Sequence, residues 1–303
     1  MRPQASCHKL GTVNKLVARG WELVAAVRHP ICVPQAMTRL SLVFVVGFSA
    51  LGLGFAQAPS TPKGEWSLRT LQHNAFRVGE KLTYVVHYGV LDAGEAVIEL
   101  QESDITMQGR KLLHAKGVGR SMGAFSWFFK VDDRYDTYFD RDGVFPWLFQ
   151  RSVSEGGYEF TQDYTYLQNK RQVRTQKEVT HDVPPHVQDM LSAFYYARTI
   201  DFGSAQPGQE YTIDCFFDDE VWPLRMRFAG RETIKLRNGK YRCLKFQPIV
   251  QEGRIFETNE DLNVWITDDG NHIPVLAQAK VLVGSIKMEL HKYEGLVHPI
   301  AME

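Results

Sequence analysis

Residues 79–100, GEKLTYVVHYGVLDAGEAVIEL, decide the fold because they have the pattern of two β-strands joined by a short turn. From Leu82 to Tyr88, each even-numbered position is apolar or aromatic, the period-two pattern of a strand with one buried face. Residues 92–94, Asp-Ala-Gly, are predicted to form the turn. Positions 96, 98 and 100 then continue the apolar face, with glutamates at 95 and 99 on the other.

Similar alternation recurs through the rest of the chain, at residues 158–166, 211–217, 224–228, 241–246, 262–266 and 275–290. Asn238-Gly239 is the strongest hairpin signal, and residues 268–270, Asp-Asp-Gly, predict a second turn. Gly284 is expected to bend the strand that follows. Strands separated by short turns over roughly 200 residues predict an all-β, mainly antiparallel fold, either a curved sheet or an open or half barrel.

One segment, residues 187–198 (VQDMLSAFYYAR), departs from the strand pattern. Its apolar residues recur at helical spacing, with Asp189 early and Arg198 late, as the helix dipole favours. An amphipathic helix needs an apolar surface to cover, so this helix is expected to lie against the concave face of the sheet or to plug one end.

The N-terminal region resembles an export signal rather than part of the fold. After Met37, a short basic start leads into the apolar run 40–55, followed by Ala56, Gln57, Ala58 and then Pro59. This pattern predicts a signal peptide over residues 37–58, cleaved between Ala58 and Pro59. A membrane anchor is the alternative, although the run is short for a span of about 20 residues. Residues 1–36 are then either an upstream start-site artefact or a long n-region.

The composition limits where in the cell the protein is expected and which classes of molecule it is expected to bind. No cysteine follows the apolar run near the predicted cleavage position, so we expect a periplasmic or secreted protein that is not a lipoprotein and keeps no stable membrane span. The first 58 residues hold six of the 35 basic side chains and one of the 35 acidic ones, so the remainder has a net charge of −5. Nucleic-acid binding, which needs a basic face, is not expected.

Two cysteines, Cys215 and Cys243, remain after the predicted cleavage and form a candidate disulfide in an exported chain. The alternation of side chains places the two cysteines on different faces of their strands, one with the apolar residues and one opposite them. Cys215 shares a face with Ile213 and Phe217, whereas Cys243 lies opposite Leu244 and Phe246. The pairing stays open at this point.

No sequence motif predicts a catalytic, metal or cofactor site. His181 and His186 lack a third ligand nearby, and we interpret them as surface histidines. The acidic run 218–220 lacks the ligand spacing and sharp glycine turn of a calcium loop, so a solvated turn between two strands is the simpler interpretation. The glycines of residues 117–123 have the wrong spacing for dinucleotide binding.

Aromatic clusters stand in segments expected to be loops: residues 127–129, residues 145–149 and Trp222-Pro223. Loops are usually polar, so these clusters either join the core or line a cavity or groove. Core packing is the default interpretation. The functional one is an apolar cavity inside a curved sheet, suited to a lipid or another apolar ligand.

Several of these segments together resemble the DUF3108 family of exported bacterial proteins. The resemblance rests on the opening pattern from Gly79 to Ala96, on YDTYFD at residues 135–140, on Phe145-Pro146, on the segment 189–198 and on the closing strands at 265–290. It implies a predominantly β, extracytoplasmic protein and supplies no catalytic residues. A curved sheet with a covering helix is also similar to the lipoprotein-carrier folds of the periplasm.

The resulting organisation is a leader over residues 59–75, a single β domain over 76–296 and a tail over 297–303. The leading functional hypothesis is an exported, non-enzymatic protein that binds an apolar or amphipathic ligand in the cell envelope. A protein-interaction or envelope-assembly module, with an exposed apolar patch around Trp127 or Trp147, is the alternative. A hydrolase whose polar residues converge only in the fold is the third hypothesis.

Overall fold

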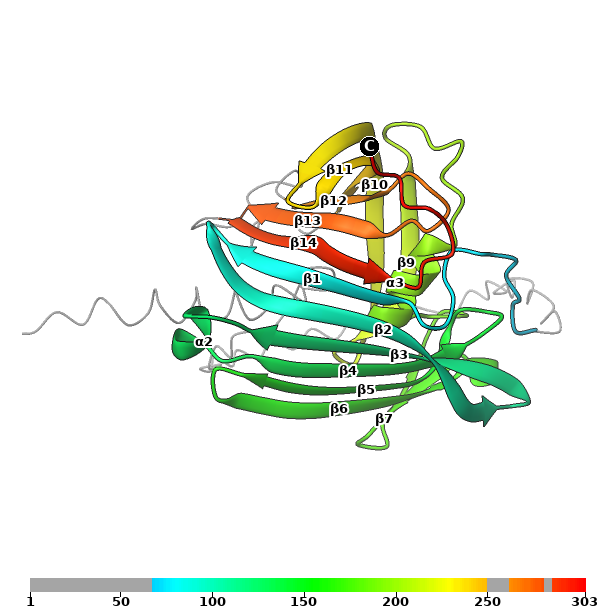
Figure 1. Ribbon diagram of the computed structural model, residues 1–303. Coiled ribbons are helices and arrows are strands. Elements are labelled where there is room, and N and C mark those ends of the chain that lie inside the picture. The colour runs from blue at the N-terminus through cyan, green and yellow to red at the C-terminus, as the bar shows by residue number, and fades with distance from the viewer. Residues whose placement is uncertain (1–66, 250–261, 281–284) are drawn as a thin grey trace, which may run out of the picture. The chain divides into compact units, whose positions relative to one another are not determined.

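The computed structural model describes residues 67–249, 262–280 and 285–303, and these form one antiparallel sheet with little helix (Figure 1). The predicted cleavage positions Ala56, Ala58 and Pro59, together with Gly284, lie outside the described residues. The helical elements are α2 (Phe125–Phe128), the 3₁₀-helix η2 (Gln168–Lys170) and α3 (Met190–Arg198). The strands are β1 (Lys81–Tyr88), β2 (Leu91–Met107), β3 (Arg110–Ser121), β4 (Asp132–Asp140), β5 (Pro146–Glu155), β6 (Tyr158–Leu167), β7 (Gln172–Thr175), β8 (Thr180–Asp182), β9 (Glu210–Phe217), β10 (Glu220–Leu236), β11 (Gly239–Pro248), β12 (Leu262–Thr267), β13 (Pro274–Lys280) and β14 (Ser285–Glu294).

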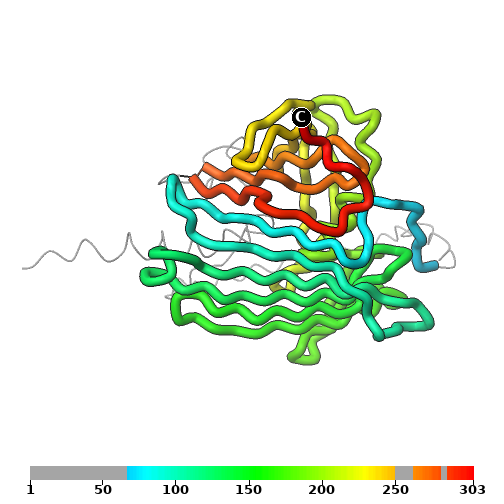
Figure 2. Tube along the Cα trace, in the orientation of Figure 1, coloured from blue at the N-terminus to red at the C-terminus, as the bar shows by residue number. Residues whose placement is uncertain are grey.

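The sheet is built from two runs of consecutive hairpins that meet at β1. Its strand order is β8-β7-β6-β5-β4-β3-β2-β1-β14-β13-β12-β11-β10-β9. The first strand therefore lies beside the last, which Figure 2 shows as a cyan strand next to a red one. Tyr84 pairs with Leu290 of β14 on one side and with Ala96 of β2 on the other. The predicted all-β, mainly antiparallel fold is confirmed.

The opening stretch forms two paired strands as predicted, but its turn lies elsewhere. The chain reverses at Gly89 and Val90, and residues 92–94 already belong to β2. Gly89 has φ of +60°, which a glycine adopts without steric cost. The reversal can therefore occur before Asp92, whose carboxylate is hydrogen-bonded to His87 on the neighbouring strand at 2.8 Å.

The predicted helix begins three residues later than expected. Val187, Gln188 and Asp189 lie outside the helix. Asp189 is extended, and Gln188 forms an isolated parallel bridge with Cys215 at the edge strand β9. The helix α3 then starts at Met190 because Asp189 caps it. It contacts β3, β4 and β9, so it covers the sheet as predicted.

The sheet stays open, and α3 lies inside its curve. Among the described strands, β9 and β8 end the sheet and are not paired with each other. Phe194 of α3 and Ile98 of β2 pack against two core clusters, one centred on β3–β6 and the other on β1 and β11–β14. Both halves of the sheet therefore enclose the same helix.

Candidate functional site

The first turn of α3 is held against β4 by Asp189. Its carboxylate accepts hydrogen bonds from the backbone N–H of Leu191 (2.8 Å) and of Ser192 (2.9 Å), while the Ser192 hydroxyl accepts one from the Asp189 N–H (2.9 Å). Thr137 on β4 donates its hydroxyl to the same carboxylate at 3.0 Å. Burial raises the pKa of Asp189 to about 6, although these hydrogen bonds act in the opposite direction. This reciprocal cap fixes where the helix begins.

The last turn of α3 is held by a buried ion pair. Arg198 Nη1 and Nη2 donate to the two carboxylate oxygens of Glu80 at 2.6 and 2.7 Å, and the two side chains are 1% and 0% exposed. The same guanidinium donates to the carbonyls of Asn271 (2.8 Å) and Ala75 (3.0 Å). Burial lowers the pKa of Arg198, but its hydrogen bonds with Glu80, its charge attraction to Glu80 and smaller contributions from Tyr195 and Tyr84 together raise it.

A cavity of about 190 Å³ lies between α3 and the sheet. One wall comes from β2, β3 and β4, and the facing wall comes from β10 to β14. The helix contributes Met190, Leu191 and Phe194. Aliphatic, aromatic and methionine side chains dominate the lining, including Met226, Val264, Ala277, Ile286 and Met288. The site therefore combines residues of α3 with residues from both halves of the sheet.

Polar side chains reach this cavity mainly at the end of α3 that carries Arg198. Tyr135, Arg198 and His272 are the described lining residues with polar side-chain atoms. His272 Nδ1 lies 3.0 Å from the Arg198 carbonyl oxygen, which can only accept, so Nδ1 carries the proton. Because Arg198 is paired with Glu80, the cavity presents no unpaired cation from that side chain. It is suited to a largely uncharged, apolar ligand.

The β9–β10 turn crosses to the far half of the sheet and closes over β5 and β6. Asp218 forms an ion pair with the buried guanidinium of Arg151, and Tyr164 donates its hydroxyl to Asp219 at 2.8 Å. Burial and the hydrogen bond to Asp219 raise the pKa of Tyr164 well above its usual range. The acidic run predicted to be a solvated turn is therefore a turn, but a half-buried one with two partners.

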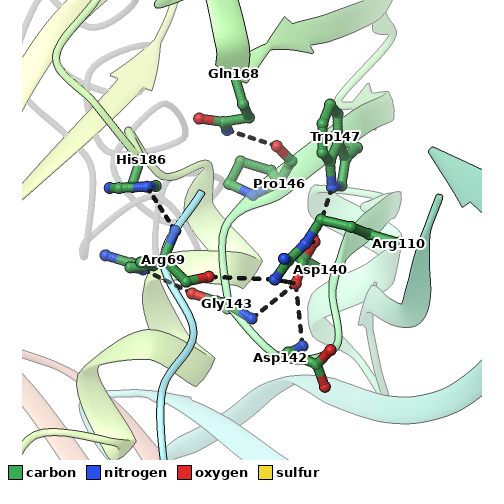
Figure 3. A network of polar contacts seen from close by, with 9 residues as sticks. All are labelled: Arg69, Arg110, Asp140, Asp142, Gly143, Pro146, Trp147, Gln168 and His186. Carbon is green, nitrogen blue, oxygen red and sulfur yellow. Dashed lines mark hydrogen bonds and ion pairs between the residues drawn. The ribbon is translucent and has the colours of Figure 1, made fainter. Parts of the chain in front are cut away.

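A second polar network lies around Asp140 and organises the β4–β5 connection (Figure 3). The Asp140 carboxylate accepts hydrogen bonds from the backbone N–H of Gly143 at 2.7 Å and from the indole of Trp147 at 3.3 Å, and it forms an ion pair with Arg110. Arg69 donates to the Gly143 carbonyl at 2.6 Å. Each polar side chain of the network contacts another part of the protein, so we interpret the network as structural support for the β4–β5 connection.

The two candidate metal-binding histidines lie in different surroundings. The ring of His181 lies 5.3 Å from that of Phe216, whereas His186 Nε2 accepts the backbone N–H of Arg69 at 3.2 Å. Burial, and then the charges of Arg69 and Arg110, lower the pKa of His186 to about 4. In the described parts of the chain, no three His, Cys, Asp or Glu residues are grouped so that they could hold a metal ion.

The candidate disulfide is not formed, and Cys215 and Cys243 are free thiols. Both strands pair with β10, where Cys215 lies opposite Trp222 and Cys243 opposite Glu232. Those positions are ten residues apart along one strand, or about 33 Å. A disulfide needs Cα atoms within about 7 Å. Burial raises the pKa of both thiols, that of Cys243 to about 12.

The three aromatic clusters differ in how far their side chains are buried. Phe145, Trp147 and Phe149 are buried, as the default interpretation predicts, so no exposed patch surrounds Trp147. Trp222 is half-buried on β10. Trp127 and Phe128 are 86% and 82% exposed on α2, which contradicts core packing for this cluster.

The sequence suggested an apolar cavity inside the curved sheet but pointed to the wrong residues, because none of residues 127–129, 145–149 and 222–223 lines the cavity. The alternation at residues 224–228 and 286–290 correctly indicates faces that include Met226 and Met288. The partnership of Arg198 with Glu80 was missed because the two residues are 118 positions apart. The glutamate at the start of a strand and the arginine at the end of a helix carry no local signal of pairing.

Comparisons with known proteins identify a family but no activity. The sequence profile of DUF3108, described as a protein of unknown function, matches residues 83–291. The comparison with curated proteins found no match. Among solved structures, the chain is similar to a β-barrel-like protein of the domain of unknown function DUF1849 from Brucella abortus, with 14% identity and a TM-score of 0.47 over 73% of this chain and 98% of that one. It is also similar to a DUF1089 family protein from Pseudomonas aeruginosa, with 9% identity and a TM-score of 0.30 over 69% and 94% of the two chains.

Proposed function

Because the chain belongs to the DUF3108 family of proteins of unknown function, we propose its role from its own cavity: it binds an apolar or amphipathic molecule without transforming it. The observation that carries this proposal is the apolar lining between α3 and both halves of the sheet. A well-formed apolar pocket with few polar groups is the usual form of a small-molecule site.

The cavity size limits the part of a ligand that it can enclose. At about 190 Å³, it is somewhat larger than an engineered apolar cavity of about 150 Å³ that binds benzene in another protein. One ring or a short stretch of acyl chain fits this space. A lipid would therefore place part of its chain inside and leave its polar end outside.

The place of action we propose is the cell envelope, with the protein exported to the periplasm or outside the cell. This rests on the signal-like pattern of residues 37–58. None of the helices in the described ranges has the length and hydrophobicity that a membrane crossing needs.

The test compares ligand content and probe binding in two variants of one strand. Ala277 on β13 pairs with Val264 and Met288, both cavity residues, so Ala277→Phe fills the space. Gln278→Phe adds the same side chain on the opposite face of the strand and serves as the matched control. The readouts are native mass spectrometry with organic extraction of the purified protein, and titration with the uncharged probe N-phenyl-1-naphthylamine.

We expect a co-purifying apolar molecule and at least about tenfold weaker probe binding in Ala277→Phe, with little change in Gln278→Phe. Equal probe binding by wild type and Ala277→Phe, together with a clean apo mass, would show that the cavity is not a ligand site. The second candidate, an interaction module, is favoured by the exposed Trp127 and Phe128 and gains weight in that case.

A further inference from the structure

Large apolar side chains are exposed at one end of the sheet. We define the apolar rim as Val90, Leu91, Met122, Trp127 and Phe128, which are 94%, 60%, 37%, 86% and 82% exposed. They account for five of the nine large apolar residues that are exposed in the described ranges. Scattered exposed apolar residues are common, but a concentration at one place indicates an interaction site.

The strand register places these five residues together. Val90 and Leu91 lie at the β1–β2 turn, and Gly94 near the start of β2 pairs with Ser121 at the end of β3. The N–H of Met122 donates to the Ala93 carbonyl at 3.0 Å, and α2 follows directly. Figure 1 shows α2 and the β1–β2 turn at the same end of the sheet.

The opposite end of the same strands is polar. There the β2–β3 turn carries Gln108 and Gly109, and the β4–β5 connection begins with Arg141 and Asp142. A turn exposed only to water favours residues of this kind. Turn geometry alone therefore does not explain why the residues of the apolar rim, at the other end, are exposed.

Charge and shape indicate what covers the rim. Residues 88–91 and 121–131 contain one charged side chain, Lys130, and no acidic residue. The apolar side chains protrude from two separate connections, so they form a pair of small projections. A protein partner would need a matching pocket for each projection. A bilayer surface needs no such fit, and tryptophan and phenylalanine partition favourably into its interface.

We propose that the apolar rim docks this protein onto a lipid surface, with Trp127 and Phe128 inserted among the lipids. The next connection along, the β5–β6 turn, carries Glu155 and Glu159 on either side of Tyr158, which is 64% exposed. Lys130 adds a weak preference for anionic lipid headgroups.

The cavity extends along the sheet from Arg198 toward the end that carries the rim. Ile286, a wall residue, pairs with Tyr88 at the last position of β1, immediately before the β1–β2 turn. The buried Arg198–Glu80 pair lies at the other end, where β1 begins. Docking through the rim would therefore bring the apolar end of the cavity toward the lipids. The docking proposal does not depend on the cavity being occupied.

The first experiment locates Trp127 directly. The full chain is mixed with vesicles of equal parts phosphatidylcholine and phosphatidylglycerol whose acyl chains carry bromine, a short-range quencher of tryptophan fluorescence. The chain has six tryptophans, so wild type is compared with Trp127→Phe, which keeps the rim apolar and removes only this reporter. We expect quenching in wild type and loss of most of it in Trp127→Phe. Equal quenching in both proteins overturns the proposal.

The second experiment measures affinity for the same vesicles without bromine. Trp127→Ser combined with Phe128→Ser should weaken partitioning at least about tenfold, because both apolar side chains are lost from the contact. Val179→Ser, at a residue 50% exposed on the β7–β8 turn, is the matched control and should change little. Because the substituted residues are exposed, the variants should melt at the wild-type temperature.

Two results would contradict lipid docking. If the double variant binds vesicles as tightly as wild type, the rim makes no lipid contact. If the double variant loses self-association in sedimentation and wild type does not bind vesicles, the rim is a protein interface. Neither result bears on probe binding in Ala277→Phe, so the two proposals fail separately.

Discussion

The most consequential single residue in the described fold is Arg198. It ends α3, lines the cavity and forms a fully buried ion pair with Glu80, which precedes β1. It also bonds the carbonyl of Asn271 in the β12–β13 connection. One side chain thus joins the helix to two segments that are distant in the sequence, the stretch before β1 and the β12–β13 connection.

Arg198→Met should lower the free energy of unfolding by about 3–5 kcal/mol, because it leaves the Glu80 carboxylate buried without its cation. Adding Glu80→Leu should recover part of this loss, since no charge then remains buried. Arg120→Met is the matched control because Arg120 and its partner Asp132 are both exposed, and it should cost less than about 1 kcal/mol. Urea unfolding measures all three. Similar losses for Arg120→Met and Arg198→Met would contradict this assignment.

Asp189 is a buried carboxyl whose pKa is raised by burial to about 6, compared with an ordinary value of 3.8. The folded protein therefore binds this proton more tightly than the unfolded chain does. Its contribution to stability is present in full at low pH and is lost as pH rises through about 6.

Asp189→Asn keeps an oxygen that can cap α3 but does not titrate. Between about pH 4 and about pH 7, wild type should lose about 2 kcal/mol of unfolding free energy relative to this variant. The difference between the two proteins removes titrations that they share. Urea unfolding across this range is the measurement, and parallel pH profiles would show that Asp189 has an ordinary pKa in the fold.

At the scale of elements, the β9–β10 hairpin matters because its turn bridges the opening of the sheet. Its contacts with the far half include the ion pair from Asp218 to Arg151 and the hydrogen bond from Tyr164 to Asp219. The ring of Phe216 also lies 5.0 Å from that of Tyr164. Side-chain contacts therefore link the two ends of the open sheet, which a closed barrel would join by backbone hydrogen bonds.

Asp218→Asn should destabilise the fold by about 2 kcal/mol, because the Arg151 guanidinium, 2% exposed, loses its carboxylate partner. Amide exchange in residues 216–222 should accelerate more than exchange elsewhere. Asp214→Asn, at an exposed position of the preceding strand β9, is the control and should leave both quantities unchanged. If exchange in 216–222 stays at the wild-type rate, the ion pair does not hold this turn.

At the scale of the whole molecule, the single curved sheet is held together without a disulfide between Cys215 and Cys243. Cys215 and Cys243 lie on strands separated by β10 and far apart along it. The buried side chains of α3 and the sheet must therefore hold the fold.

Alkylation of the unfolded, unreduced protein should label both Cys215 and Cys243, because neither thiol is oxidised in the fold. Peptide mapping by mass spectrometry reads each position separately, so the remaining cysteines of the chain do not interfere. A peptide pair linked through these two residues would contradict the strand register.

Local pattern in the sequence did not predict β3, β4, β7 or β8, and residues 146–149 and 222–223, which were expected to be loops, belong to β5 and β10. It did predict β1, β2, β6 and β9 to β14, the Asn238-Gly239 hairpin between β10 and β11, and a helix that covers the sheet. These features follow from periodicity and turn chemistry, which act over a few residues. The start of α3 was misplaced because Val187 continues the apolar pattern of the helix, yet the backbone of Gln188 bonds with β9. The first turn was misplaced because Gly89 and residues 92–94 offer similar local signals.

Only the tertiary structure decided how distant segments meet. Residues 127–129 and 145–149 are alike in composition, but Trp127 is 86% exposed and Trp147 is 1% exposed. The strand order, in which the last strand pairs with the first, determines three features. These are the cavity, the Arg198–Glu80 pair and the distance between the two cysteines. The sequence by itself determined which residues alternate, because side chains on a strand point to opposite faces in turn. It could not determine which faces oppose each other, because that choice depends on burial summed over the whole sheet.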